Sequence, residues 1–174
     1  SIFNQMRSSG VNFVAMEVSS HALHQHRTDC IDFDAALFTN LTLDHLDYHK
    51  TMNEYADAKK ILFDSMNTDS IAISIFNENW TDYILKDCKS KSKYVIGYEQ
   101  DFDIFIDKII LNSNGCEFTL KENANEIAIK SPLLGKFNIE NLSIAATLAL
   151  AKGIKPIIIK KALEIATGAP GRMQ

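Results

Sequence analysis

The first residues whose types and spacing could carry chemistry lie between residues 17 and 27. Glu17 stands near the end of an apolar run and is followed by serines, three histidines and Arg27. In an open parallel sheet, ligands gather at the carboxyl ends of strands, and this set of side chains suits a cation beside an anionic substrate. A purely structural alternative is that Glu17, Ser19 and Ser20 cap the next helix. Residue types alone leave both readings open.

A second cluster, at residues 39–49, contains two aspartates and two histidines within six residues. His45 and His49 are four residues apart, so on a helix they would share one face, an arrangement that suggests zinc. However, the chain has no HExxH motif and no cysteine nearby, so the zinc signal is weak. Together with Glu17, the cluster favours a cation site over separate surface histidines.

A third cluster consists of two adjacent lysines, Lys59 and Lys60, on the helix predicted at residues 52–63. Lysines on helices are usually solvated. Helical spacing distinguishes the two, because Lys59 shares a face with Tyr55 and Leu62 whereas Lys60 points elsewhere.

Several function classes are disfavoured by what the 174 residues lack. There is no GxxxxGK[ST] phosphate loop, no GxSxG elbow and no GxGxxG fingerprint.

The three cysteines are far apart, which indicates reduced thiols rather than a disulfide frame. A net charge of −4 argues against nucleic-acid binding. No apolar window reaches the roughly 18 residues of a membrane span and no secretory leader is visible, so we expect a cytoplasmic protein.

The elements that would position these clusters alternate between apolar runs and helical patterns, which predicts an α/β fold with a mostly parallel sheet covered on both faces. Buried strands are predicted at residues 12–18, 35–38, 71–76 and 94–97, and helices at 52–63 and 78–87.

The pattern then changes to three short strands separated by Asn- and Gly-containing turns, typical of an antiparallel meander. These strands are predicted at residues 103–111, 116–120 and 126–129, with helices following at 138–152 and from Pro156 to about 166. Residues 168–172 form a Gly/Pro-rich turn. We expect both ends to be internal to a longer chain.

Five stretches match the motifs of one enzyme family. They are MEVSSHAL at residues 16–23, FTNLTLDHLDYH at 38–49, YADAK at 55–59, LGKFNIEN at 134–141 and PGRM at 170–173. With these the chain resembles the Mur ligases, specifically the UDP-N-acetylmuramoyl-tripeptide synthetases. The DHLDYH stretch is highly specific, and the similarity covers essentially the whole chain.

The resemblance implies that residues 1–167 are most of a P-loop-type central ATPase domain without its first part, and that residues 168–174 lead into a C-terminal domain. It implies a monomeric ligase of peptidoglycan synthesis that uses ATP to phosphorylate UDP-MurNAc-L-Ala-D-Glu. The amine of a free amino acid, meso-diaminopimelate or L-lysine, then attacks the acyl phosphate. Such catalysis depends on positioning and positive charge. Without the phosphate loop, the 174 residues alone are expected to be inactive.

The resemblance also implies a role for each cluster. Glu17 and His45 would be Mg²⁺ ligands, and Lys59 would react with CO₂ to give a carbamate that is a third ligand. This favours magnesium over zinc, although His is an unusual ligand for a hard cation.

The remaining implied contacts are with the two larger substrates. Ser19, Gln25 and Arg27 match positions that contact the nucleotide-peptide, and the fork of Arg27 suits a phosphate or carboxylate. Asn138, Asn141 and Arg172 match positions near the ATP base.

Two other functions remain as alternatives. One is a zinc or magnesium hydrolase using Glu17, His45 and His49, which would need neither ATP nor a modified lysine. The other is a non-enzymatic module that binds a partner through its meander. The joint presence of Glu17, Asp44, His45 and Lys59 argues against the second, because a binding role does not need all four.

Overall fold

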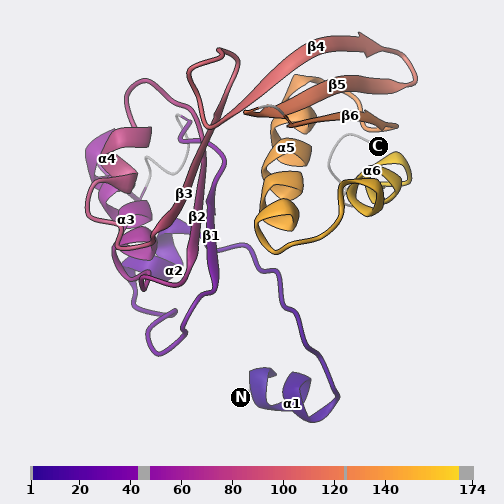
Figure 1. Ribbon diagram of the computed structural model, residues 1–174. Coiled ribbons are helices and arrows are strands. Elements are labelled where there is room, and N and C mark those ends of the chain that lie inside the picture. Colours follow the sequence, from indigo (N-terminus) through magenta and orange to yellow (C-terminus); the bar gives the residue numbers. More distant parts are fainter. Residues whose placement is uncertain (1, 43–47, 124, 169–174) are drawn as a thin grey trace.

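The computed structural model describes residues 2–42, 48–123 and 125–168 (Figure 1). The helices are α1 (Ile2–Ser8), α2 (Ser20–His24), α3 (Met52–Asp64), α4 (Thr81–Leu85), α5 (Lys136–Ala151) and α6 (Pro156–Glu164). The strands are β1 (Ala35–Phe38), β2 (Ile71–Ile75), β3 (Ser92–Gly97), β4 (Ile104–Asn112), β5 (Gly115–Glu122) and β6 (Asn125–Ser131). Among these residues, no helix combines the length and apolarity needed to cross a membrane.

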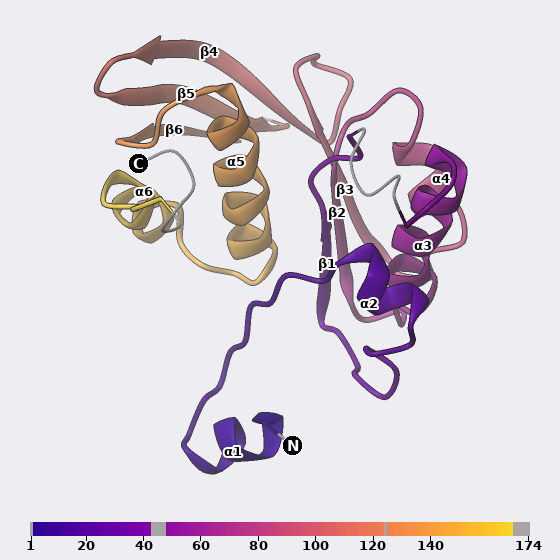
Figure 2. The ribbon, with the colours of Figure 1, turned by 180° about the vertical axis from the view of Figure 1, so that it is seen from behind.

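The strands form one sheet in the order β1-β2-β3-β4-β5-β6. The first four pair in parallel, and β4, β5 and β6 pair antiparallel. The predicted α/β fold with a parallel sheet and an attached meander is therefore confirmed. Figures 1 and 2 show α2, α3 and α4 on one side of the sheet and α5 on the other.

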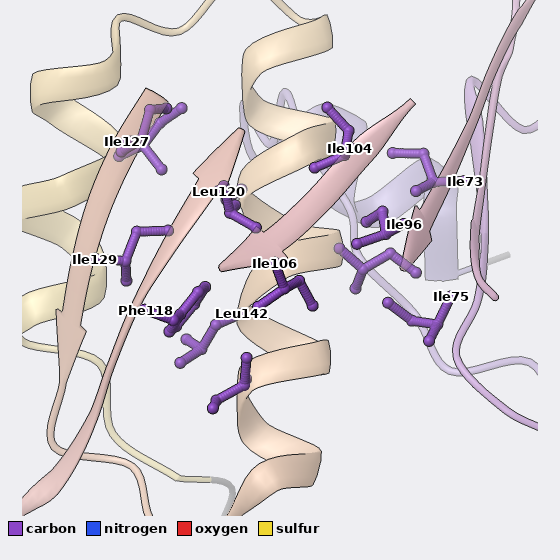
Figure 3. Packing of buried hydrophobic residues seen from close by; sticks show 14 of the residues in the cluster. Ile73, Ile75, Ile96, Ile104, Ile106, Phe118, Leu120, Ile127, Ile129 and Leu142 are labelled. Carbon is purple, nitrogen blue, oxygen red and sulfur yellow. The ribbon is translucent and has the colours of Figure 1, made fainter. Parts of the chain in front are cut away.

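Strand β2 explains why the sheet is covered on both faces, because all five of its residues are buried. Ile71, Ile73 and Ile75 pack in the core that includes α5, whereas Ala72 packs in the core that includes α3 and α4. Alternate residues of a strand point to opposite faces, so a strand buried on both must be apolar throughout. Figure 3 shows the larger core, which continues from Ile73 through Ile96 and Ile104 into the meander.

The meander is closed by the turn chemistry that the sequence indicates. Asn112 pairs with Gly115 across a two-residue turn, and Gly115 has a φ of 141°. A Cβ at this position would lie 2.0 Å from the backbone oxygen of Ser131, so glycine is required there. The absence of a side chain at Gly115 therefore lets the start of β5 approach the end of β6, with which it pairs.

The prediction of a strand at residues 12–18 is wrong. The segment has no regular secondary structure and runs away from the sheet toward α1 (Figures 1 and 2). A strand requires a neighbour to accept and donate its backbone hydrogen bonds. Within the described residues β1 pairs with β2 alone, and segment 11–18 faces β1 across a cavity of about 450 Å³.

The helix predicted at residues 78–87 is also shorter than expected, since α4 covers only Thr81–Leu85. Asn77 accounts for the late start. Its side-chain oxygen accepts a hydrogen bond from the backbone N–H of Asn79 at 3.1 Å, which holds the preceding residues in a turn.

Candidate active site

The candidate site lies where segment 11–18 leads into α2 and where α3 passes beside them. Figure 2 shows α2 against α3, and the two helices are in contact. Glu17 and Lys59 come from these two parts of the chain, so the fold brings together two of the three sequence clusters. Part of the second cluster, residues 43–47, lies outside the described residues; it includes His45.

Lys59 extends from α3 toward the end of segment 11–18. Its Nζ donates a hydrogen bond to the Val18 carbonyl oxygen at 3.4 Å. The negative charge of Glu17 favours the protonated form of the amine. Burial lowers the pKa of the Lys59 amine below its ordinary value of 10.5, and Glu17 offsets this only in part. The Nζ also lies 5.9 Å from the centre of the Tyr55 ring. The amine is therefore held beside a carboxylate and is more easily deprotonated than a surface lysine.

Lys60 points to the other side of α3, as its helical phase predicts. Its Nζ donates to Asp64 at 2.5 Å and to Asp87 at 2.7 Å, and only 8% of the residue is exposed. Burial alone would lower the pKa of Lys60, but these two aspartates outweigh it and raise the pKa above 10.5. Lys60 therefore joins α3 to the end of α4 and takes no part in the site.

The alternative interpretation of the first cluster, that its polar residues cap the next helix, is confirmed for Ser19. Its side-chain oxygen accepts a hydrogen bond from the Ala22 N–H at 3.1 Å and so forms the N-cap of α2. Ser20, the first residue of the helix, is fully buried. Glu17 is exposed and does not belong to the helix. The cap fixes the direction in which α2 leaves the segment that carries Glu17.

A group of aromatic and imidazole rings lies between α2, residues 48–49 and α3. His24 Nδ1 is 2.9 Å from the Tyr48 hydroxyl, and the His21 ring lies 4.0 Å from the Tyr48 ring. His49 is buried, with its Nε2 at 2.9 Å from the Ser20 hydroxyl. Its ring stacks on Tyr55 of α3, with centres 5.3 Å apart and planes at 10°. Sequence analysis considered His49 only as a possible metal ligand and missed these contacts, because they join residues far apart in the chain.

The other two residues expected to meet the nucleotide-peptide follow α2. Gln25 Nε2 lies 3.4 Å from the Tyr48 hydroxyl, at the far limit of a hydrogen bond. Arg27 is exposed, and its backbone N–H donates to the Ala22 carbonyl at 2.9 Å. This backbone hydrogen bond holds the turn that carries the Arg27 guanidinium against the end of α2.

Asn138 and Asn141 lie at the start of α5, on the opposite side of the sheet from α3 (Figure 1). Asn138 donates its side-chain amide to the Leu134 carbonyl at 2.8 Å, and Asn141 is exposed. Nearby, the Tyr98 hydroxyl donates to Glu140 at 2.7 Å, an arrangement in which burial and the Glu140 carboxylate raise the pKa of Tyr98. No sequence signal singled out Tyr98. Arg172 lies outside the described residues.

The described residues fit a Mg²⁺ site in part. Glu17 offers the carboxylate oxygens that this ion prefers. Within the described part of the chain, no three His, Cys, Asp or Glu side chains converge as metal ligands. Lys59 in its ammonium form would repel a cation, so the site needs a change in that side chain before it can bind one. A hydrolase centred on His49 is not favoured, because the His49 imidazole faces Ser20 and Tyr55.

Comparison with known sequences gives a consistent result. The model of the Mur ligase middle domain matches residues 1–149. A UDP-N-acetylmuramoyl-L-alanyl-D-glutamate--2,6-diaminopimelate ligase from Geobacillus kaustophilus is 38% identical over 178 residues, covering 99% of this chain and 36% of the relative. The ligase of the same name from Clostridium tetani is 35% identical and likewise covers 99% of this chain and 35% of the relative. The chain thus spans about a third of the length of the curated relatives it matches.

Solved structures resemble the fold over most of its length. A structure of a UDP-N-acetylmuramoyl-L-alanyl-D-glutamate--2,6-diaminopimelate ligase superposes with a TM-score of 0.86 at 31% identity, covering 96% of this chain and 35% of the other. MurF from Acinetobacter baumannii gives a TM-score of 0.73 at 26% identity and covers 81% of this chain and 31% of the other.

Proposed function

Because this chain belongs to the Mur ligase family through its middle domain, we propose that the full-length protein is an ATP-dependent ligase of peptidoglycan synthesis. It adds 2,6-diaminopimelate to UDP-MurNAc-L-Ala-D-Glu, the reaction for which the relatives are named. L-lysine is the alternative amino acid. The placement of Lys59 beside Glu17 carries the proposal, because a ligase of this type needs a cation site at that point.

Lys59 gains its role by modification. Its amine has a lowered pKa, so a larger fraction is neutral, and the neutral amine is the form that attacks CO₂. A bond forms between Nζ and the carbon, and a proton is lost, which leaves a carbamate. This converts a cation into a carboxylate-like group next to Glu17. The two groups, with His45, would then hold Mg²⁺, which supplies charge neutralisation for the phosphates of ATP.

The remaining residues bind and orient the substrates. Ser19, Gln25 and Arg27 contact the nucleotide-peptide from α2 and the turn after it, and the planar Arg27 fork matches a phosphate or carboxylate. Asn138, Asn141 and Arg172 contact ATP near its base.

The terminal carboxylate oxygen of the nucleotide-peptide attacks the γ-phosphorus and ADP leaves. The amine of the amino acid then attacks the acyl carbon, and phosphate leaves as the amide forms.

The test is an assay of the full-length protein with ATP, Mg²⁺ and UDP-MurNAc-L-Ala-D-Glu. Parallel reactions contain meso-diaminopimelate, L-lysine or no amino acid, and the products are identified by mass spectrometry. The proposal expects the diaminopimelate tripeptide, with one ADP and one phosphate released for each amide. ATP-independent hydrolysis of the nucleotide-peptide, or no amide with either amino acid, would refute it.

A further inference from the structure

His49 makes a buried polar contact that none of the roles assigned above uses. Only 3% of the residue is exposed, and its Nε2 lies 2.9 Å from the hydroxyl of Ser20, which has no exposed surface. Polar groups in such surroundings are costly to leave unpaired, so the two side chains constrain one another strongly. The contact therefore fixes where residues 48–49 meet α2.

The same imidazole also contacts α3. Its ring is stacked on Tyr55, which is 6% exposed and precedes Lys59 by about one helical turn. His49 itself shortly precedes the start of α3, and Ser20 directly follows the cap residue Ser19. Through these two contacts His49 joins its own segment to α2 and to α3. Helix α3 carries Lys59, and the residues proposed to bind the nucleotide-peptide flank α2.

The geometry points to His49 as a positioning residue that sets α2, and with it Ser19, Gln25 and Arg27, relative to Lys59. An apolar ring of similar size could stack on Tyr55 and fill the space. It could not make the directional bond to Ser20 that prevents α2 from shifting along α3. This inference rests on the proposed function, since the residues it positions are those that bind the nucleotide-peptide and the metal.

The kinetic test uses four single variants and one double variant of the full-length enzyme. His49→Phe keeps a stacked ring and removes the hydrogen bond, whereas His49→Gln keeps a polar group near the place of Nε2. Ser20→Ala removes the partner with little change in volume. Ser113→Ala is the matched control for the serine change, because Ser113 is an exposed serine in the turn between Asn112 and Gly115.

In His49→Phe and Ser20→Ala we expect the KM for the nucleotide-peptide to rise about tenfold, the scale of one lost buried hydrogen bond. The KM for ATP should change less than about twofold, since Asn138 and Asn141 lie across the sheet. His49→Gln should recover most of the loss. The double variant His49→Phe/Ser20→Ala should be no worse than His49→Phe, and Ser113→Ala should match the wild type. An unchanged KM for the nucleotide-peptide, or equal losses in the Gln and Phe variants, overturns the inference.

Hydrogen exchange separates this inference from the proposed function. Without substrates, amides of residues 20–27 should exchange faster in His49→Phe and Ser20→Ala than in the wild type and in His49→Gln. If the wild-type protein forms no amide product, the proposed function fails, while the exchange result still decides whether His49 holds α2. Unchanged exchange at these residues in Ser20→Ala, the variant least able to disturb folding, overturns the positioning role.

Discussion

Lys59 and Lys60 are adjacent on α3, yet the pKa values of their amines shift in opposite directions. Lys59 faces the Val18 carbonyl and Glu17 with a lowered pKa, and Lys60 is held between Asp64 and Asp87 with a raised one. The side chains of two successive residues on a helix point about 100° apart. Lys59 can therefore lie in the candidate site while Lys60 connects α3 to the turn after α4.

Replacing Lys59 by alanine should remove at least about 99% of the ligase activity of the full-length enzyme, because one metal-binding group is lost where phosphoryl transfer needs it. Thermal unfolding should be nearly unchanged, and added bicarbonate should not help. Intact-mass and peptide analysis of the wild type should place the added CO₂ on Lys59. Near-normal turnover of the variant, or a modification at Lys60, would show that the assignment is wrong.

Replacing Lys60 by methionine should affect stability and leave ligation nearly intact. The change removes both hydrogen bonds and leaves Asp64 and Asp87 to repel one another. Because both aspartates are exposed to solvent, we expect only a small loss in the free energy of unfolding. Urea titration measures it. A loss of activity larger than the loss of folded protein would place Lys60 in the site after all.

The same ion pair predicts a response to acid. The hydrogen bond from Lys60 lowers the pKa of Asp87 below its ordinary value of 3.8. A lowered carboxyl pKa contributes stability that is present above pH 3.8 and is lost as the pH falls through the folded-state value. Urea midpoints between pH 5 and pH 2.5 should therefore fall less steeply in Lys60→Met than in the wild type. Parallel curves for the two proteins would contradict the assignment of the Asp87 pKa to Lys60.

Replacing Arg27 by lysine should raise the KM for the nucleotide-peptide by about tenfold and that for ATP by less than about twofold. Lysine keeps the positive charge and loses the planar fork. Initial rates with each substrate varied in turn measure both constants. An unchanged KM for the nucleotide-peptide would remove Arg27 from the binding site.

The 174-residue chain should bind Mg-ATP only weakly, with a Kd above about 1 mM. A triphosphate needs backbone N–H groups around it, a lysine near its terminal phosphates and a hydroxyl on the metal, and the sequence contains no loop of that kind. Glu17 would add negative charge on the same side. Calorimetry measures the affinity directly, and micromolar binding would mean that other residues form the nucleotide site.

How much the sequence predicted depends on whether a signal was local. The apolar run of β2 and the turn before Gly115 act within a few residues, and both were predicted correctly. Lys59 was distinguished from Lys60 by helical phase alone. Residues 12–18 have the composition of a buried strand, but pairing depends on a neighbour and cannot be read from the segment itself. The contact of His49 with Ser20 joins distant residues, and no spacing rule indicates it.

The order of strand pairing has a consequence for how the chain folds. Asn112 and Gly115 meet across a two-residue turn, whereas Ala35 and Ile71 are far apart in the sequence and α3 lies between them. Closing a short hairpin takes on the order of microseconds, and contacts between distant residues form more slowly because they cost more chain entropy. We expect the meander to form early and the β1–β2 pairing late. The residues at the end of β1 and on α3, which include Lys59, would then be assembled among the last, on a scaffold that is already in place.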